Sequence, residues 1–261
     1  IPGVETFAGE TYHTANWPHE GVDFTGKRVG LIGTGSSGIQ TTPIVAAQAA
    51  ELVVFQRTPN FSVPAGNEPL TPEREAEVKA NYDERRALSW RSGGGSPHMA
   101  HPKRTMELSA EERRAEFEKR WQLGGVLFSK TFLDQMVDPV ANAEAKKFYE
   151  EKVRAVIDDP AVADMLIPND HPIGAKRICT DTNYFQTFNQ PHVKLVSVKK
   201  TPIEKIDATG ITTTEARFDL DAIIFATGFD ALTGALGRID ITGRGGEKLK
   251  QNWVDGPRSY L

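Results

Sequence analysis

Short apolar runs lie near both ends of this chain, and a long charged segment separates them. Residues 29–32 and 52–55 are apolar runs with the length of buried strands, and residues 37–50 between them are compatible with a helix. This order predicts a β-α-β unit with a right-handed crossover. Because parallel strands are usually covered on both sides, we expect helices on both faces of the sheet.

The middle of the chain, residues 71–166, is charged and indicates a helical segment. Thr71 followed by Pro72 is typical of a helix start, and Ser109 with Glu112 has the spacing of a capping box. These helices carry only short apolar stripes. The positions expected to pack are Phe117, Trp121, Tyr149, Val153, Val156 and Ile157.

Turn and strand signals mark the end of this helical segment. Asp159 and Pro160 should end one helix and cap the next. Residues 92–97, Ser-Gly-Gly-Gly-Ser-Pro, have no periodicity, and we expect a mobile loop there. Further strands should complete the sheet that begins at Val29, and they cover residues 193–196, 203–206 and 222–226.

Composition limits the functions that the chain can have. Its 261 residues are 39% hydrophobic, enough for a sizeable core, and 31 Lys and Arg against 35 Asp and Glu give a net charge of −4. The sequence has no basic stripe, which disfavours nucleic-acid binding. It has no apolar run near the roughly 20 residues that span a bilayer and no signal-peptide pattern, so we expect no membrane partner and a cytoplasmic location.

The sequence does not indicate metal or disulfide chemistry. Cys179 is the single cysteine, so it cannot form an internal disulfide, and we expect it to be a small packed apolar residue. The His and acidic residues are scattered, without the spacing of a metal-ligand cluster. The chain begins with Ile1 and stops at Leu261 just after the turn-like pair Gly256-Pro257, which leads us to expect a fragment of a longer protein.

A glycine turn links the first predicted strand to its helix. Gly33, Gly35 and Gly38 form the pattern Gly-x-Gly-x-x-Gly. A pyrophosphate needs backbone N–H groups and a helix amino end at close range, and residues without side chains permit that approach. The turn therefore predicts a dinucleotide site. The hydroxyl groups expected to add contacts there belong to Thr34, Ser36 and Ser37.

The residues after the second strand select between the two nicotinamide dinucleotides. An acidic residue there would bind the ribose 2′-OH of NAD, but the chain has Arg57 followed by Thr58. Arg57 lies 24 positions after Gly33, close to the roughly 20 expected, and a guanidinium pairs well with a 2′-phosphate. We therefore expect Arg57 and Thr58 to bind NADP(H); the alternative is that Arg57 only caps the sheet edge in solvent. The predicted fold class is α/β, a Rossmann-like NADP-binding domain with a helical insertion.

A second pattern precedes the glycine turn by fewer than twenty residues. It reads Phe-x-Gly-x-x-x-His-x-x-x-Trp-Pro, and its residues are Phe7, Gly9, His13, Trp17 and Pro18. The segments that accompany it are Lys176-Arg177, Asn183-Tyr184-Phe185, Phe188-Asn189 and Phe225-Ala226-Thr227-Gly228-Phe229-Asp230. Together they resemble type I Baeyer-Villiger monooxygenases, flavoenzymes that use NADPH and O2 to convert ketones into esters or lactones. The resemblance covers essentially the whole chain.

The resemblance implies a role for each basic residue near the turn. Arg57 and Lys176 would hold the 2′-phosphate of NADPH, and Arg177 would be the catalytic arginine that faces the flavin. An arginine suits that place because it stays protonated and can stabilise negative charge during the reaction. An ordinary salt bridge is the alternative role for Arg177. The implied cofactors and partners are NADP(H), FAD, O2 and a small-molecule ketone.

Other residues of the family segments are expected to be structural. We interpret His13 as an orienting hydrogen-bonding residue at a domain hinge, Trp17 with Pro18 as a packed anchor, and Ala226-Thr227-Gly228 as a return linker. The resemblance implies a discontinuous NADP-binding domain, a helical insertion and the start of a returning FAD-domain segment. The residues assigned to these parts are 1–63 with 171–228, 64–170 and 229–261.

The same resemblance predicts what this chain does not contain. A complete enzyme of this kind has an earlier FAD-binding glycine turn with a catalytic acid, and a long carboxyl-terminal segment. We therefore expect the isolated chain to be inactive and its last residues to expose apolar surface. The functions that stay open beside a Baeyer-Villiger monooxygenase are a flavin-dependent N- or S-oxygenase, an NADPH reductase, and an NADP-binding regulatory module without redox activity.

Overall fold

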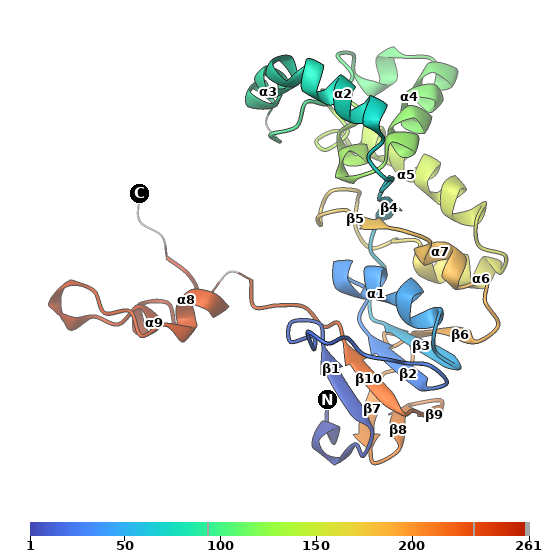
Figure 1. Ribbon diagram of the computed structural model, residues 1–261, viewed down its shortest axis with the longest axis vertical. Coiled ribbons are helices and arrows are strands. Elements are labelled where there is room, and N and C mark those ends of the chain that lie inside the picture. The colour runs from blue at the N-terminus through green and yellow to red at the C-terminus, as the bar shows by residue number, and fades with distance from the viewer. Residues whose placement is uncertain (93, 232, 259–261) are drawn as a thin grey trace.

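A five-stranded parallel sheet organises the computed structural model, which describes residues 1–92, 94–231 and 233–258 (Figure 1). The strand order is β1-β10-β2-β3-β6, and neighbouring strands are parallel throughout. The strands of this sheet are β1 (Glu10–His13), β2 (Arg28–Ile32), β3 (Glu51–Gln56), β6 (Val193–Ser197) and β10 (Ala222–Phe225). The structure is thus of the α/β class, and the expected strands at 193–196 and 222–226 join the sheet as predicted.

The β-α-β unit expected at the glycine turn is present. Helix α1 (Ser36–Ala46) connects β2 to β3, and Val29 pairs with Leu52 in the register of the two strands. Ile39 and Val45 of α1 are buried in the same apolar cluster as the inner residues of both strands. The local pattern sufficed for this unit because its two strands are buried and follow each other closely in sequence.

The opposite face of the sheet corrects two of the expectations. It is covered by a three-stranded antiparallel sheet and not by helices, and the segment expected at 203–206 belongs to this second sheet. Its strands are β7 (Ile203–Asp207), β8 (Gly210–Thr213) and β9 (Arg217–Asp219). Ile206, Ile211 and Leu220 are buried against β2, β3 and β10, and the rings of Phe55 and Phe218 meet edge to face at 5.3 Å. Only one side of β7 is apolar, which suits an outer strand and not a buried parallel one.

The sequence analysis missed β1. This strand pairs with β10 at the sheet edge, and its residues are half-buried or exposed. Its sequence, Glu-Thr-Tyr-His, has no apolar run because an edge strand needs none. The consequence is that His13 of the family pattern lies directly beside Phe225, next to the segment that leaves the sheet.

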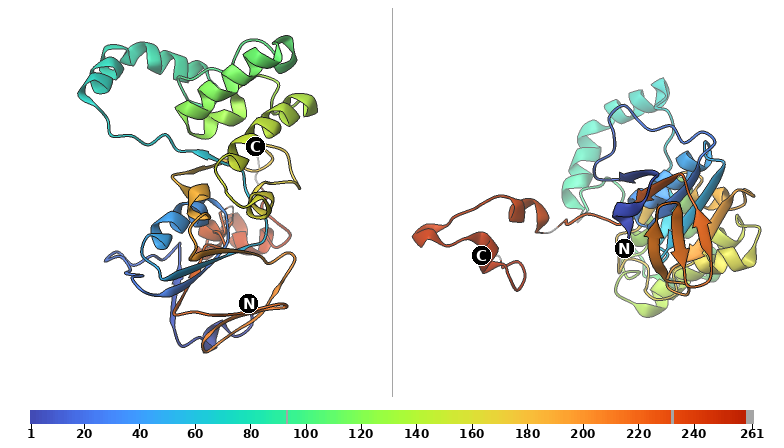
Figure 2. Two further views of the ribbon diagram at one scale, coloured as in Figure 1. Left: turned by 90° about the vertical axis from the view of Figure 1, so that its right-hand side faces the viewer. Right: turned by 90° about the horizontal axis from the view of Figure 1, so that it is seen from below.

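The helical segment lies beyond the carboxyl ends of the strands (Figures 1 and 2). Its α-helices are α2 (Pro72–Ala80), α3 (Tyr82–Arg91), α4 (Ala110–Leu123), α5 (Pro139–Arg154) and α6 (Pro160–Leu166). The expected helix starts are confirmed: Thr71 caps α2, Ser109 and Glu112 form the capping box of α4, and Asp159 caps α6. The expected stripes also pack, with Phe117 and Trp121 against Phe128. Short 3-10 helices accompany them at Thr105–Glu107 and Val126–Lys130.

A short two-stranded sheet joins this segment to the main sheet. It pairs β4 (Ser62–Pro64) with β5 (Cys179–Asp181), and helix α7 (Tyr184–Thr187) follows. The hydroxyl of Ser62 donates to the buried carboxylate of Asp181 at 2.6 Å, and Tyr149 of α5 is fully buried nearby, with its hydroxyl 3.3 Å from the N–H of Ser62. The connection from β3 to β6 therefore contains the whole helical segment.

Residues 229–231 and 233–258 extend away from the rest of the molecule as an arm, which carries α8 (Gly234–Arg238) and α9 (Leu249–Asn252) (Figures 1 and 2). The exposure expected here is confirmed for the described residues, since Phe229, Ile239 and Val254 expose 59%, 55% and 79% of their surface. Leu232 and residues 259–261 of the predicted returning segment lie outside the described residues, as does Gly93 of the loop at 92–97. The mobility of that loop and the domain boundaries stay predictions.

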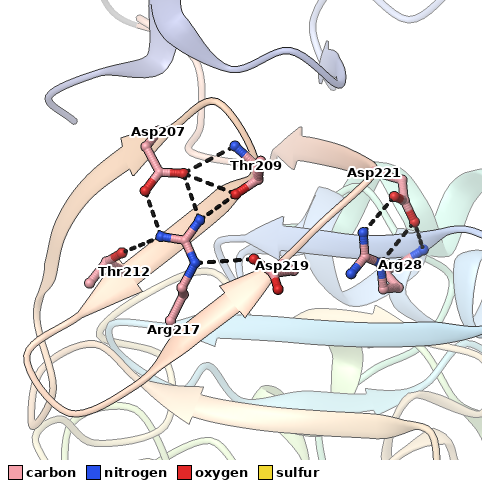
Figure 3. Close-up of polar contacts among 7 residues, drawn as sticks. All are labelled: Arg28, Asp207, Thr209, Thr212, Arg217, Asp219 and Asp221. Atoms are coloured by element: carbon pink, nitrogen blue, oxygen red, sulfur yellow. Dashed lines mark hydrogen bonds and ion pairs between the residues drawn. The ribbon is translucent and has the colours of Figure 1, made fainter.

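Ion pairs fasten the strand starts and the outer sheet (Figure 3). Asp221, just before β10, accepts from the guanidinium of Arg28 at 2.8 and 3.1 Å and from its backbone N–H at 2.8 Å. These hydrogen bonds lower the pKa of Asp221 to about 2. On β9, Arg217 pairs with Asp207 at 2.6 Å and with Asp219 at 3.1 Å, and its hydrogen bonds lower the pKa of Asp207.

The Asp221 pair predicts a pH-dependent loss of stability. Because the native pKa lies below its ordinary value of 3.8, the pair stabilises the fold above about pH 4, and the contribution is lost as the pH falls toward 2. The two side chains are about 40% exposed, so we expect Asp221→Asn to cost only about 0.5–1 kcal/mol at pH 7 in urea unfolding. The difference from the unaltered chain should shrink below pH 4. A cost that stays constant down to pH 3, or an equal cost for the exposed control Asp158→Asn, would contradict the role of the pair.

Candidate functional site

The glycine turn is built by close backbone contacts. Gly33 ends β2 with φ +113°, and a Cβ there would lie 2.3 Å from the carbonyl oxygen of Ala226. A Cβ on Gly38 would lie 2.1 Å from the carbonyl oxygen of Gly33. Both positions therefore require glycine for the fold itself. The turn, the first turn of α1 and the end of β10 meet at one point.

Gly35 is different because nothing surrounds it. A Cβ at this position would have no atom within 4 Å, and its φ of −82° is accessible to any residue. Gly35 caps α1 without a side-chain hydrogen bond, so the amino end of this helix is open. Exposed N–H groups at a helix amino end attract anions. The open space at Gly35 fits a phosphate group and has no evident use in packing.

The neighbouring hydroxyls divide into two kinds. Thr34 is buried, and its hydroxyl donates to the carbonyl oxygen of Thr58 at 3.0 Å, which ties the glycine turn to the end of β3. Its hydroxyl therefore serves the fold. Ser36 is exposed and Ser37 is half-buried at the start of α1, so both hydroxyls remain near the open helix end.

Arg57 follows β3 immediately and is exposed. Among the residues that the structure describes, its side chain makes no ion pair and no hydrogen bond to a side chain. Thr58 is fixed by the bond from Thr34, so Arg57 is held one residue from the point where the glycine turn and β3 are joined. A free guanidinium at this place suits an anion, and a ligand with a phosphate on its ribose would supply one.

Lys176 and Arg177 reach the same region from the start of β5. The N–H of Cys179 donates to the carbonyl oxygen of Phe61 at 2.8 Å, which holds this segment beside the residues that follow Arg57. A hydrogen bond from His171 lowers the pKa of Asp170, and the charge of Lys176 contributes to the same lowering. Both basic side chains are exposed.

Cys179 is packed as expected. Burial raises the pKa of its thiol, the carboxylate of Asp181 raises it further, and the charge of Arg177 and a hydrogen bond with Ser36 act in the opposite direction. The side-chain amide of Asn60 donates to the sulfur at 3.3 Å. The thiol is accordingly a packing group.

Gly174 shows a contact that sequence reasoning missed. Its φ is +92°, and a Cβ there would lie 2.1 Å from the terminal methyl of Met136. Met136 comes from the helical segment, just before α5, and Gly174 lies two residues before Lys176. The helical segment is anchored to the loop that carries Gly174 by Asn142 of α5, whose side-chain amide donates to the carbonyl oxygen of Ile173 at 2.9 Å and accepts from the N–H of the same residue at 3.1 Å. A glycine with no periodic context gave no signal of this contact.

The residues of the first family pattern meet at the sheet edge. Nδ1 of His13 accepts from the N–H of Ala15 at 3.0 Å, and its Nε2 lies 3.4 Å from the hydroxyl of Thr227. Since Nδ1 accepts, Nε2 carries the proton and donates to Thr227. A Cβ on Gly9 would lie 2.5 Å from the carbonyl oxygen of Asp221, so this glycine permits the close approach of β1 to the start of β10.

The remaining residues of that pattern pack. Trp17 contacts Tyr12 and Phe24, with ring centroids 5.6 and 6.1 Å apart, and Phe7 packs against the cluster between the two sheets. Pro18 begins a turn in which its carbonyl oxygen accepts from Gly21. Ala226 is buried against the glycine turn, and Thr227 and Gly228 are exposed where the arm begins.

The fold and this site are typical of dinucleotide-binding α/β proteins. No protein-family model matches the chain. Sequence relatives nevertheless cover it fully: cyclohexanone 1,2-monooxygenase of Acinetobacter sp is 42% identical over 266 residues, 100% of this chain and 48% of the relative. A Baeyer-Villiger monooxygenase of Pseudooceanicola batsensis is 40% identical over 99% of this chain and 48% of the relative, and phenazine N-monooxygenase PhzNO1 of Lysobacter antibioticus is 40% identical over 100% and 48%.

Solved structures agree with this relationship. An oxidized steroid monooxygenase bound to NADP is 62% identical with a TM-score of 0.94, over 99% of this chain and 50% of that one. OTEMO in complex with FAD and NADP is 41% identical with a TM-score of 0.94, over 100% and 49%. Over its whole length the chain is therefore similar to Baeyer-Villiger monooxygenases. It spans about half the length of the curated relatives it matches.

The two kinds of glycine give a testable contrast. Gly38→Ala should lower the free energy of unfolding by about 1–3 kcal/mol, because the added Cβ collides with backbone. Gly35→Ala should change it by no more than about 0.5 kcal/mol, because the added Cβ meets nothing. Gly35→Ala should nevertheless weaken dinucleotide binding about tenfold, since the methyl group fills the space that we assign to phosphate. Urea unfolding and calorimetric titration measure the two effects. Full binding by Gly35→Ala would remove this position from the site.

Proposed function

We propose that this chain is the NADPH-binding portion of a Baeyer-Villiger monooxygenase that inserts one oxygen atom of O2 next to a ketone carbonyl. The observation that carries the proposal is the guanidinium of Arg57, which forms no ion pair within the described residues and precedes Thr58, the residue hydrogen-bonded to Thr34 of the open glycine turn. This arrangement offers a pyrophosphate site and a 2′-phosphate site in one rigid unit. The NADP-bound steroid monooxygenase, at 62% identity, supports it.

The residues divide the binding task by position. Gly33, Gly35 and Gly38 would admit the pyrophosphate to the amino end of α1, with hydroxyl contacts from Ser36 and Ser37. The hydroxyl of Thr34 instead holds the turn against β3. Arg57, Thr58 and Lys176 would bind the 2′-phosphate, because two cations and a hydroxyl-bearing residue suit a doubly charged group.

Arg177 is proposed as the catalytic residue. When bound, NADPH supplies reducing equivalents and FAD supplies the activation of O2. Arg177 lies next to the proposed phosphate-binding Lys176 and is exposed, so its guanidinium is available to a second partner. Its fixed positive charge would stabilise negative charge on the reacting oxygen and on the tetrahedral adduct of the ketone.

The other residues of the family patterns are proposed as structural. His13 with Thr227 would fasten the point where the arm leaves the sheet, and Ala226 and Gly228 would let the chain pass closely there. Phe7 and Gly9 would fix β1 to the sheet edge, and Trp17 with Pro18 would fix the segment between β1 and β2. None of these residues is assigned a chemical step.

We also propose the domain division that the sequence suggested. Residues 1–63 and 171–228 would form the NADP-binding domain, 64–170 the insertion, and 229–261 the start of a segment that returns to the FAD domain. All strands of the main sheet come from residues 1–63 and 171–228, and α2 to α6 all come from residues 64–170, which supports the division. The exposed apolar residues of the arm fit a segment that packs elsewhere in the complete protein.

Partners and location complete the proposal. A small-molecule ketone and O2 would be the substrates of the complete enzyme, in the cytoplasm and without a nucleic-acid partner. The net charge of −4 supports the last point. In the parts of the chain that the structure describes, no helix is long and apolar enough to cross a membrane.

N-oxygenation is the second candidate function. A phenazine N-monooxygenase is 40% identical over the whole chain, close to the value for the ketone-oxidising relatives. Assaying the complete protein with a cyclic ketone and with an aromatic N-heterocycle separates the two activities. Ester formation from the ketone supports our proposal, and N-oxide formation without any ester would replace it.

Arg57→Ala tests the nucleotide preference. In the complete protein, we expect the dissociation constant of NADP+ to rise about ten- to a hundredfold, because a charge-assisted hydrogen-bonded pair is lost. The dissociation constant of NAD+ should barely change. Arg86→Ala, which removes an exposed arginine of α3, is the control. Equal losses for both nucleotides would contradict the 2′-phosphate role.

Arg177→Ala tests the catalytic assignment. In the complete protein, reduction of the flavin by NADPH should continue largely unchanged in stopped-flow absorbance. Ester formation should fall by about a hundredfold or more, as expected when a preorganised charge is removed from a reaction centre. An unchanged product yield would take Arg177 out of the catalytic role.

A further inference from the structure

A hollow lies at the carboxyl ends of β3 and β6, beside Arg57. Its volume is about 510 Å³, and it continues past Thr58 to the residues that follow α6. Arg57 lines it, and so do Lys199 and Lys200. The sequence analysis did not assign these two lysines, because they are remote from every motif in the chain.

The main sheet fixes the two lysines next to Arg57. Gln56 pairs with Ser197 in the β3–β6 register, and the N–H of Val198 donates to the carbonyl oxygen of Gln56 at 2.9 Å. The N–H groups of Lys200 and Thr201 then both donate to the carbonyl oxygen of Ser197, at 3.0 and 2.9 Å. The backbone of Lys199 and Lys200 is therefore held in a hydrogen-bonded turn directly beside the residue that precedes Arg57.

Part of the lining of the hollow is apolar, and a hydrogen bond fixes its position. Its apolar members are Pro59, Ala161, Met165 and Ile167. Gln56, which is only 3% exposed, donates from its amide to the carbonyl oxygen of Met165 at 2.7 Å. This bond fastens the end of α6 to β3. An apolar wall beside cations suits a ligand that combines a flat aromatic base with a phosphate group.

The acidic side chains that line the hollow have partners, and the basic side chains differ from them in this respect. Of its two acids, Asp164 forms an ion pair with Arg154 and Asp170 is hydrogen-bonded to His171, each at 2.6 Å. Across the residues that the structure describes, Arg57, Lys199 and Lys200 make no ion pair. Cations gathered at one place repel each other, and a bound anion would offset that repulsion.

We propose that Lys199 and Lys200 are specificity-determining residues that hold the 2′-phosphorylated adenosine end of NADPH. The purine would lie against Met165 and Ile167, and the ammonium groups would add to Arg57 at the 2′-phosphate. This inference rests on the proposed function. It extends the proposed 2′-phosphate site from the residues after β3 to the residues after β6, the neighbouring strand of the sheet.

The test is the double substitution Lys199→Gln/Lys200→Gln in the complete protein, which removes both charges and keeps most of the aliphatic stems. Calorimetric titration is carried out with NADP+, NAD+ and adenosine 2′,5′-bisphosphate, which has the 2′-phosphate and no nicotinamide. We expect the dissociation constants of NADP+ and the bisphosphate to rise about tenfold or more, because charge-assisted hydrogen bonds are lost, while that of NAD+ stays nearly constant.

The double substitution Lys194→Gln/Lys205→Gln is the matched control. It removes the same charge from exposed positions of β6 and β7 that do not line the hollow. Thermal unfolding of both variants reports whether the fold is kept. The control should leave all three dissociation constants unchanged, and an effect equal to that of the test variant would reduce the result to overall charge.

The outcomes separate this inference from the proposed function. If the unaltered protein prefers NADP+ and the test variant keeps that preference in full, the inference is overturned and the proposed function stands. If the unaltered protein shows no preference for NADP+ over NAD+, both are overturned. Equal weakening of NAD+ and NADP+ by the test variant would also overturn the inference, because the lysines would then act on a shared part of the two nucleotides.

Discussion

The site depends on how closely three pieces of backbone approach at the end of β2. Gly33, Gly38 and Ala226 come within distances that no Cβ would allow, and this contact joins the strand, the helix and the end of β10 into one rigid point. Because packing already accounts for two of the glycines, their presence alone says little about a ligand. Gly35 is informative because it lacks a side chain where nothing crowds it. The open helix end beside it is the place where a phosphate can be held without cost to the fold.

The basic residues around this point come from parts of the chain that are far apart in sequence. Arg57 follows β3, Lys176 and Arg177 precede β5, and Lys199 and Lys200 follow β6. The hydrogen bond from Thr34 to Thr58 and the two hydrogen bonds between Asn142 of α5 and Ile173 hold two of these segments from different sides. The proposed anion site would therefore draw on the whole crossover, including the helical segment. The helices would serve it by positioning the loop before Lys176, which is a positional role and not a chemical one.

The sequence predicted the local features well and the tertiary ones less well. The β2-α1-β3 unit and the caps at Thr71, Ser109 and Asp159 are set by residues close in sequence, so their patterns were readable. The edge strand β1 and the antiparallel outer sheet were missed or misassigned because half-exposed strands carry weak patterns. Lys199 and Lys200 lie near Arg57 because β6 is next to β3 in the sheet, and the order of strands cannot be derived from local sequence patterns. The roles of the site residues remain predictions, supported by their geometry.

The placement of the helical segment inside the β3–β6 connection has a consequence for how the molecule forms. Leu52 pairs with Val193, so this ladder closes a loop of well over a hundred residues, and entropy opposes such closure until other contacts have shortened it. During synthesis β3 is made long before β6. The edge of β3 that pairs with β6 therefore stays unpaired until the intervening helices have been made. The proposed anion-binding rim combines residues from both ends of this loop, so it can form only after the loop has closed.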